Sequence, residues 1–491
     1  MNLIKILFLI LGTIILIIFP FAYIEYKGDK FYYLLFTLTS SFALFYNFRK
    51  GSIFFETFFS LLLWLGFWFK FSVQIAFLNG MFPEGFGRFS HDPQAYDEVI
   101  LISQIAIFAL IFSSYLREKF IYSYVNLELN KKEPQNLINF YLKFRKRIIY
   151  LLFLLILITV FINFNFSFFQ KGTIPNFILP FGLNNIFKWL LMFGFASFFS
   201  IIIYMEFLLK KKKRKNILKF GFLENFFSSI ASISRAMIFN STALFFGYYR
   251  MMELSNLKID KKTFIKYYFL ICVLFLVSLI IVSKIRQTND FPIGHQVHEY
   301  VPIIQVEDQA DLIPALKPII EPLNDFILEF NQILFLIAGR WVGVDSLMAV
   351  QSIENKGFGL IYESLNEKFD YSNSFYENKI KGSFHFYKRD PKVYTIYVPG
   401  IVGYLYYSNS LIFVFSSIVA LSILCAFIEL LSYKISKNNL IFASLIGNVL
   451  AYRLAHFGYM PLNSYKILFA IFMNLLILYL IFKAINKLQK K

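Results

Sequence analysis

The stretch MNLIKILFLILGTIILIIFPFAYI, from Met1 to Ile24, decides the fold class of this chain. Lys5 precedes an apolar run that is longer than the hydrophobic region of a signal peptide, and no small-residue cleavage site follows it. About 20 apolar residues in a helix cover the thickness of a bilayer. We therefore expect a first transmembrane helix here, and similar stretches recur along the sequence.

Composition indicates the same class. Hydrophobic residues make up 58% of the 491 residues and charged residues only 16%, which leaves too little polar surface to cover a soluble globule. The sequence therefore predicts an all-α polytopic membrane protein with about 10–12 transmembrane helices. Ten expected spans lie near residues 5–24, 31–47, 53–75, 98–115, 148–167, 186–208, 267–284, 408–432, 440–457 and 466–483.

Charge sorts the loops between these spans into two sets. Basic residues concentrate in alternate short loops and in both terminal segments, including the run Lys210–Lys215, and the positive-inside rule places them in the cytoplasm. Residues 286–397 instead carry 15 acidic and ten basic residues, so we expect this long loop between late spans to be outside. Both termini should then be cytoplasmic. The net charge of +19 is explained by basic residues that set the topology and lie beside anionic lipid headgroups, and it does not indicate a nucleic-acid partner.

The segment Phe220–Tyr249, with Arg235 in its middle, needs a separate interpretation. If it crossed the membrane once, the acidic loop would be cytoplasmic, so we expect a hairpin or a re-entrant pair. An arginine at membrane depth costs about 2.5 kcal/mol or more, so Arg235 is either functional or a snorkelling structural charge. The chain then divides into a transmembrane bundle (1–284), an outer loop with surface helices (285–397) and C-terminal helices (398–491).

Familiar catalytic signatures are absent from the sequence. It contains no Walker phosphate loop, no dinucleotide-binding glycine fingerprint, no HExxH and no GxSxG. Cys272 and Cys425 both fall in expected spans, so neither a disulfide framework nor a thiolate metal site is expected. We accordingly expect no metal and no cofactor.

Arginines on the expected outer side are the main candidates for chemistry. Arg340 and Arg389 fall in the long loop, whereas Arg453 and His456 are three residues apart and share a helical face near a span end. Guanidinium groups bind phosphate oxygens in pairs and stay charged at any pH, so converging arginines suit a diphosphate. The histidine can serve as a general base or a hydrogen-bond donor. Alternatively, each arginine pairs with a loop carboxylate such as Asp345 or with lipid headgroups.

Two further groups are weaker candidates. Trp341 and Tyr407 are candidates for substrate binding because aromatic rings stack on sugars, although tyrosines at the start of a span also form an interfacial belt. The first outer loop offers a metal site, a base or merely solvated side chains at His91, Asp92, Asp97 and Glu98.

Three stretches carry a resemblance to a known family. They are GRWVGVDSLMAVQS (339–352), YTIYVPGIVGYLYYSNSLIFVF (394–415) and RLAHFGYMPLNSY (453–465). Together with the polytopic plan and the large late loop, they resemble the bacterial oligosaccharide repeat-unit polymerases of the O-antigen polymerase type. The resemblance is best over residues 286–465, and the N-terminal half is similar only in general plan.

The resemblance implies a membrane glycosyltransferase of polysaccharide biosynthesis on the outer face of the bacterial inner membrane. Its substrate in the lipid bilayer would be an undecaprenyl-diphosphate-linked oligosaccharide, with a flippase and a chain-length regulator as candidate protein partners. Arg340 and Arg389, with Arg453 and Arg235, would clamp the diphosphate leaving group. His456 or a loop carboxylate would take the proton of the acceptor hydroxyl. Such stabilisation by fixed arginines needs no metal.

Two other functions compete with this one. Another lipid-phosphosugar-dependent glycosyltransferase would use the acidic first outer loop around Asp92 as its catalytic element. A lipid-linked oligosaccharide flippase or another transporter would place polar residues at the middle of several spans and show repeat symmetry. The early spans are almost wholly apolar and the polar residues concentrate outside, which favours the enzyme.

Overall fold

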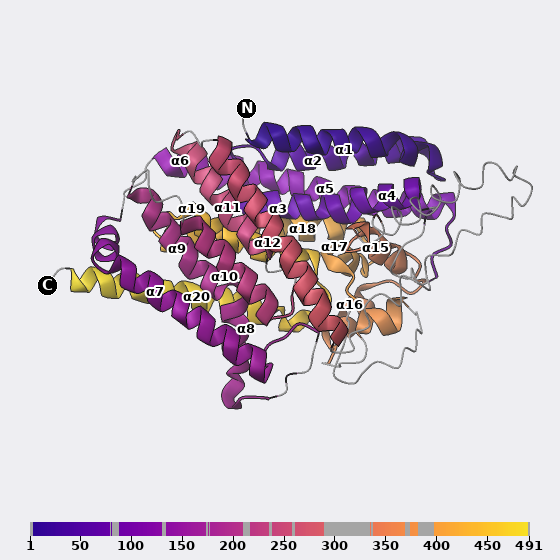
Figure 1. Ribbon diagram of the computed structural model, residues 1–491. Coiled ribbons are helices and arrows are strands. Elements are labelled where there is room, and N and C mark those ends of the chain that lie inside the picture. The colour runs from indigo at the N-terminus through magenta and orange to yellow at the C-terminus, as the bar shows by residue number, and fades with distance from the viewer. Residues whose placement is uncertain are drawn as a thin grey trace, which may run out of the picture.

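The computed structural model of this chain (Figure 1) describes residues 3–78, 80, 88–129, 134–172, 175, 177–209, 217–234, 238–257, 261–288, 334, 337–368, 374–381 and 397–489. Every regular element in these ranges is a helix, which confirms the predicted all-α fold. Arg235, Arg389 and most of the predicted surface helices of the long loop lie outside the described residues.

Eight helices in the described ranges are long and apolar enough to cross a membrane. Each coincides with one of the predicted spans, and this confirms a polytopic membrane protein. They are α1 (Leu3–Glu25), the continuous run of α3 (Phe54–Leu63), η1 (Trp64–Phe69) and α4 (Lys70–Phe77), α5 (Pro93–Phe120), α7 (Gln135–Phe166), the continuous run of η2 (Pro180–Gly182), α8 (Asn184–Trp189), η3 (Leu190–Gly194) and α9 (Phe195–Leu208), α12 (Lys261–Thr288), α18 (Leu411–Ile435), and α20 (Tyr465–Leu488) with the short η6 (Pro461–Ser464) before it.

Shorter helices fill the space between the long ones. The α2 helix buries three polar residues, Thr37, Ser40 and Asn47. The α19 helix has only 16 residues and packs against α3, α9, α11 and α18. Two helices, α10 and α11, lie in the region where the sequence predicts a hairpin. The bounds are α2 (Lys30–Asn47), α6 (Tyr124–Leu129), α10 (Ile217–Ala231), α11 (Ile238–Leu254) and α19 (Leu440–Ala455).

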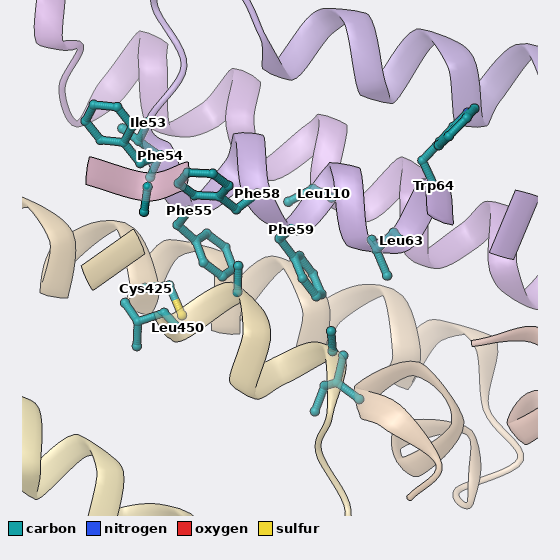
Figure 2. Close-up of a cluster of buried hydrophobic side chains, with 14 of the residues drawn as sticks. Ile53, Phe54, Phe55, Phe58, Phe59, Leu63, Trp64, Leu110, Cys425 and Leu450 are labelled. Atoms are coloured by element: carbon teal, nitrogen blue, oxygen red, sulfur yellow. The ribbon is translucent and has the colours of Figure 1, made fainter. Parts of the chain in front are cut away.

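The centre of the bundle is the contact of α3 with α5, α18 and α19. Eight of the ten residues of α3 are buried by its neighbours, among them four phenylalanines. Its N-terminus is satisfied by Glu429, which accepts hydrogen bonds from the backbone N–H groups of Phe54 (2.9 Å) and Phe55 (2.7 Å). Figure 2 shows this core with Ile53, Phe54, Phe55, Phe58, Phe59, Leu63, Trp64, Leu110, Cys425 and Leu450 labelled.

The two ends of the bundle differ. At one end, where the sequence predicts cytoplasmic loops, Arg49 pairs with Glu118 and Arg117 of α5 pairs with Glu56 of α3, while Arg250 and Glu253 form an ion pair within α11. The first and last helices both reach this end, since the Phe8 ring lies 4.8 Å from that of Phe45 and Asn136 donates to Asn486 at 3.3 Å. The opposite end carries what is described of the long loop (Figure 1), α15 (Val344–Gln351), α16 (Phe358–Leu365) and η5 (Tyr376–Lys381), and the short helix α17 (Gly400–Tyr406) that follows it.

Candidate functional site

A contact between two glycines positions the loop that carries Arg340. The loop 339–343 lies against η1, a π-helical turn whose wider winding interrupts the transmembrane helix. A Cβ atom on Gly343 would come within 2.1 Å of the carbonyl oxygen of Gly66, and a Cβ on Gly66 would come within 2.2 Å of the Val342 oxygen. The two backbones therefore approach as closely as only glycine allows.

A buried ion pair fixes the same loop one helical turn further along. The ammonium of Lys70 lies 2.5 Å from the carboxylate of Asp345, and both side chains are fully buried. Lys70 also donates to the carbonyl oxygen of Trp341 at 2.8 Å. Asp345 lies in the first turn of α15, where the helix dipole favours a negative charge. The turn at Arg340 is thus held from the membrane side by α4.

The three stretches that carry the resemblance meet at one place in the fold. At Gly400, which has a φ of 69°, a Cβ atom would come 3.0 Å from the carbonyl oxygen of Ala455 and 3.1 Å from the side chain of Val342. Beside it Pro399 packs on Gly458, whose φ of 117° favours glycine. The site at this end of the bundle is therefore composite, built from segments far apart in the sequence.

Trp341 links this place to α11 and α19. Its ring lies 6.3 Å from that of Phe239, which in turn lies 6.1 Å from the ring of Tyr452. The preceding Arg340 is exposed, and no carboxylate in the described ranges pairs with it. Its alternative partner from sequence, Asp345, is taken up by the buried ion pair. Within the described part of the chain, Arg340 therefore presents a positive charge without a counterion.

His456 and Arg453 lie at the same end of α19, with Arg453 in its last turn and His456 just after it. The His456 ring stacks on Tyr452 at 4.1 Å, and its Nδ1 lies 3.0 Å from the Tyr452 carbonyl oxygen. Because a carbonyl only accepts, Nδ1 carries the proton and Nε2 keeps a lone pair. Burial and the nearby charge of Lys171 lower the pKa of His456, in the loop beyond α19, to about 4. The ring is thus neutral at neutral pH.

Three lysines accompany Arg453, and the sequence analysis missed them. Lys188 of α8 lies within electrostatic range of Lys171, Arg453 and Lys466, and the Lys171 ammonium donates to the Tyr452 hydroxyl at 3.3 Å. None of these four cations has a carboxylate partner among the residues that the structure describes. They form what we call the basic cluster. Each lysine alone is typical of a snorkelling side chain at a span end, so no local pattern connects them.

Glu367 is the acidic group where the loop meets the end of α19, and the sequence analysis missed it too. Its carboxylate accepts from the backbone N–H groups of Phe375 at 2.6 Å and Met460 at 2.5 Å. Burial raises the pKa of Glu367 above its ordinary range. Nothing distinguishes it in sequence from the other loop carboxylates. It ties the segment after α16 to the segment after α19.

Tyr407 lies in the packed base of this region. The side chain is fully buried, with its ring 5.2 Å from that of Tyr404 and 6.3 Å from that of Phe375. Its carbonyl oxygen accepts from the backbone N–H of Gly357 at 2.7 Å. In this arrangement its ring packs against protein, and no described contact joins it to the arginines.

The acidic residues that the sequence assigns to the first outer loop are engaged in structural hydrogen bonds at the start of α5. Asp97 accepts from the hydroxyl of Tyr26 at 2.6 Å and from the backbone N–H of Asp29 at 3.0 Å. Glu98 accepts from Gln351 of α15 at 2.8 Å. The neighbouring candidates hold similar positions: His91 contacts the Tyr96 hydroxyl at 2.8 Å, and Asp92 immediately precedes α5. Within the described ranges, no group of three or more His, Cys, Asp or Glu side chains could hold a metal ion.

Comparison with known proteins adds no relative. No protein family, no curated protein and no solved structure matches this chain. Of the predicted site residues, Arg340 and Trp341 lie in the loop that contacts the segments at Gly400 and Ala455, and Arg453 and His456 lie at the adjoining end of α19. Tyr407 is buried, and Arg235 and Arg389 are outside the described residues.

Proposed function

We propose that this chain is an integral-membrane glycosyltransferase that polymerises oligosaccharide repeat units carried on undecaprenyl diphosphate. The supporting observation is a composite site, built from the three stretches of the resemblance, that holds cations and a neutral histidine; its described arginines, Arg340 and Arg453, pair with no carboxylate among the residues that the structure describes. An uncompensated group of fixed cations suits an anion such as a diphosphate.

The proposed reaction is a displacement at the anomeric carbon. A hydroxyl oxygen of the acceptor oligosaccharide forms the new bond to that carbon, while the bond from the carbon to the diphosphate oxygen breaks. The electron pair leaves with the lipid diphosphate, whose growing negative charge Arg340 and Arg453 stabilise. The resemblance adds Arg389 and Arg235 to this clamp. The Nε2 atom of His456 takes the proton of the acceptor hydroxyl.

The proposed location follows from the charge pattern. The basic loops and both terminal segments would lie in the cytoplasm, and the composite site would lie at the outer face of the bacterial inner membrane. A flippase would deliver the lipid-linked substrate to that face, and a chain-length regulator is the other candidate partner.

The transporter remains a second candidate because of one buried acid. Glu224 of α10 is 2% exposed, and one of its carboxylate oxygens has no hydrogen-bond partner in the described ranges. Ionisable groups at membrane depth are costly and commonly mark ion or substrate pathways. If the chain is a flippase, Glu224→Gln should stop movement of lipid-linked single repeats across the membrane, whereas a polymerase variant should leave such repeats accumulated outside.

The test of the polymerase uses purified protein with a lipid-diphosphate oligosaccharide in the presence of EDTA. Loss of one preorganised donor to developing charge typically costs a factor of about 100 to 1000 in rate. Arg340→Ala and Arg389→Ala should therefore each abolish long polymer and leave single repeat units, while the protein still inserts. Arg49→Ala, at the other end of the bundle, is the matched control. Full activity in both variants, or activity that needs a divalent ion, would reject the arginine mechanism and return attention to Asp92.

A further inference from the structure

The basic cluster lies beside a strongly exposed apolar segment. In residues 177–186 the exposed fraction is 59% for Phe177, 84% for Ile178 and 100% for Phe181. Isolated exposed apolar residues are ordinary, but a contiguous run at the end of a membrane helix marks a surface for lipid or protein. The segment leads directly into α8 and reaches Lys188.

Local contacts hold this segment against the cluster. The amide of Asn184 donates to the carbonyl oxygens of Phe168 at 3.1 Å and Phe177 at 2.9 Å. The Phe187 ring lies 4.8 Å from that of Phe168, and the Lys188 ammonium lies 5.9 Å from the centre of the Phe169 ring. The apolar surface and the charges are thus parts of one folded unit.

Lys171 is held beside this folded unit by its backbone. Its backbone N–H donates to the carbonyl oxygen of Ser232, at the end of α10, at 2.8 Å. Lys171 and Lys466 are exposed, whereas Lys188 and Arg453 are half-buried. The positive charges therefore extend from the surface inward toward His456.

We propose that the basic cluster binds the diphosphate of a lipid whose hydrocarbon chain lies along residues 177–186. This inference deepens the proposed function and rests on it for the identity of the substrate, because it names the face by which a lipid-linked substrate reaches His456. Charge complementarity selects the ligand: four cations match a diphosphate with two or more negative charges, whereas a phospholipid diester carries one.

The binding test uses farnesyl diphosphate as the probe and purified protein in a neutral detergent. Lys171→Gln/Lys188→Gln should weaken binding about tenfold or more, because two charge-assisted contacts are lost. Lys434→Gln/Lys437→Gln, which removes two exposed lysines at the opposite end, is the control and should bind normally. Phe181→Ser should weaken binding of farnesyl diphosphate and leave that of inorganic diphosphate unchanged, because Phe181 contributes only apolar contact.

Several results would overturn the proposal. They are unchanged affinity in Lys171→Gln/Lys188→Gln, an equal loss in the control, or phosphatidylglycerol in nanodiscs competing as well as the diphosphate, which would mean ordinary headgroup contact only. The polymerase proposal fails separately. If the probe binds as expected but no lipid-linked oligosaccharide is polymerised, the lipid site is supported and the polymerase function is rejected. If Lys171→Gln/Lys188→Gln forms normal polymer, the polymerase function is supported and the lipid site is rejected.

Discussion

The ammonium of Lys70 and the carboxylate of Asp345 lie 2.5 Å apart, in a fully buried contact between α4 and the first turn of α15. One partner belongs to a membrane-spanning helix and the other to the long loop. A lone charge in such surroundings is expensive, so neither side chain is stable there without the other. The pair therefore determines where the loop carrying Arg340 sits on the bundle.

Breaking this pair from one side should destabilise the protein strongly. Lys70→Met leaves Asp345 buried without a counterion, at an expected cost of about 3–5 kcal/mol. The double variant Lys70→Met/Asp345→Leu should recover much of this loss, because both charges are gone. Thermal unfolding in detergent measures the difference. Lys50→Met is the control, since Lys50 is 62% exposed and 3.9 Å from Glu253, and the expected change is under about 1 kcal/mol. A wild-type melting temperature for Lys70→Met would contradict the burial of the pair.

Two glycines of the long loop give a matched steric test. Alanine at Gly343 would place its Cβ atom 2.1 Å from the backbone of Gly66, whereas no atom lies within 4 Å of a Cβ at Gly357. Gly343→Ala should therefore displace the Arg340 loop. Because a misplaced catalytic group slows the reaction, polymer formation should fall by about tenfold or more. Gly357→Ala should behave as wild type. Equal activity of the two variants would show that the contact of Gly343 with Gly66 has no role in positioning.

Membrane class and helix positions could be predicted from the sequence because they depend on local composition. A run such as residues 151–162, LLFLLILITVFI, is stable in a bilayer as a helix, because a helix satisfies its backbone hydrogen bonds internally. The i,i+3 spacing of Arg453 and His456 likewise placed both residues at one end of α19. Neither inference required knowledge of how the helices pack.

The lysines of the site could not be predicted, because tertiary packing alone brings them together. Lys171, Lys188 and Lys466 come from three separate segments, and each has an ordinary explanation as an interfacial charge. The pairing of Lys70 with Asp345 was equally hidden, because it joins an early membrane-spanning helix to the long loop, far apart in the sequence. Tyr407 shows the reverse problem: its position next to a span predicted an accessible ring, yet α17 folds so that the ring is covered.

The sidedness of the bundle can be tested by labelling single cysteines. In a background with Cys272 and Cys425 replaced by serine, Glu363→Cys should react with a membrane-impermeant maleimide in intact cells. Glu363 lies in α16, at the end of the bundle that carries the long loop, and its side chain is 51% exposed. Lys437→Cys, at the opposite end, should react only after permeabilisation. Reaction of Lys437→Cys alone in intact cells would invert the proposed topology.

The pH dependence of polymerisation tests His456 as the base. A base must be unprotonated, and because the pKa of His456 is lowered to about 4, activity should stay level as the pH falls and decline only near that value. The charges that face the ring are those of Lys171 and Arg453, and Tyr452 accepts its Nδ1 proton. Lys171→Gln removes one opposing charge, so the acid limb of kcat should move to higher pH. His456→Ala should lose a factor of about 100 or more and show no such limb. An acid limb that Lys171→Gln does not move would mean that another group accepts the proton.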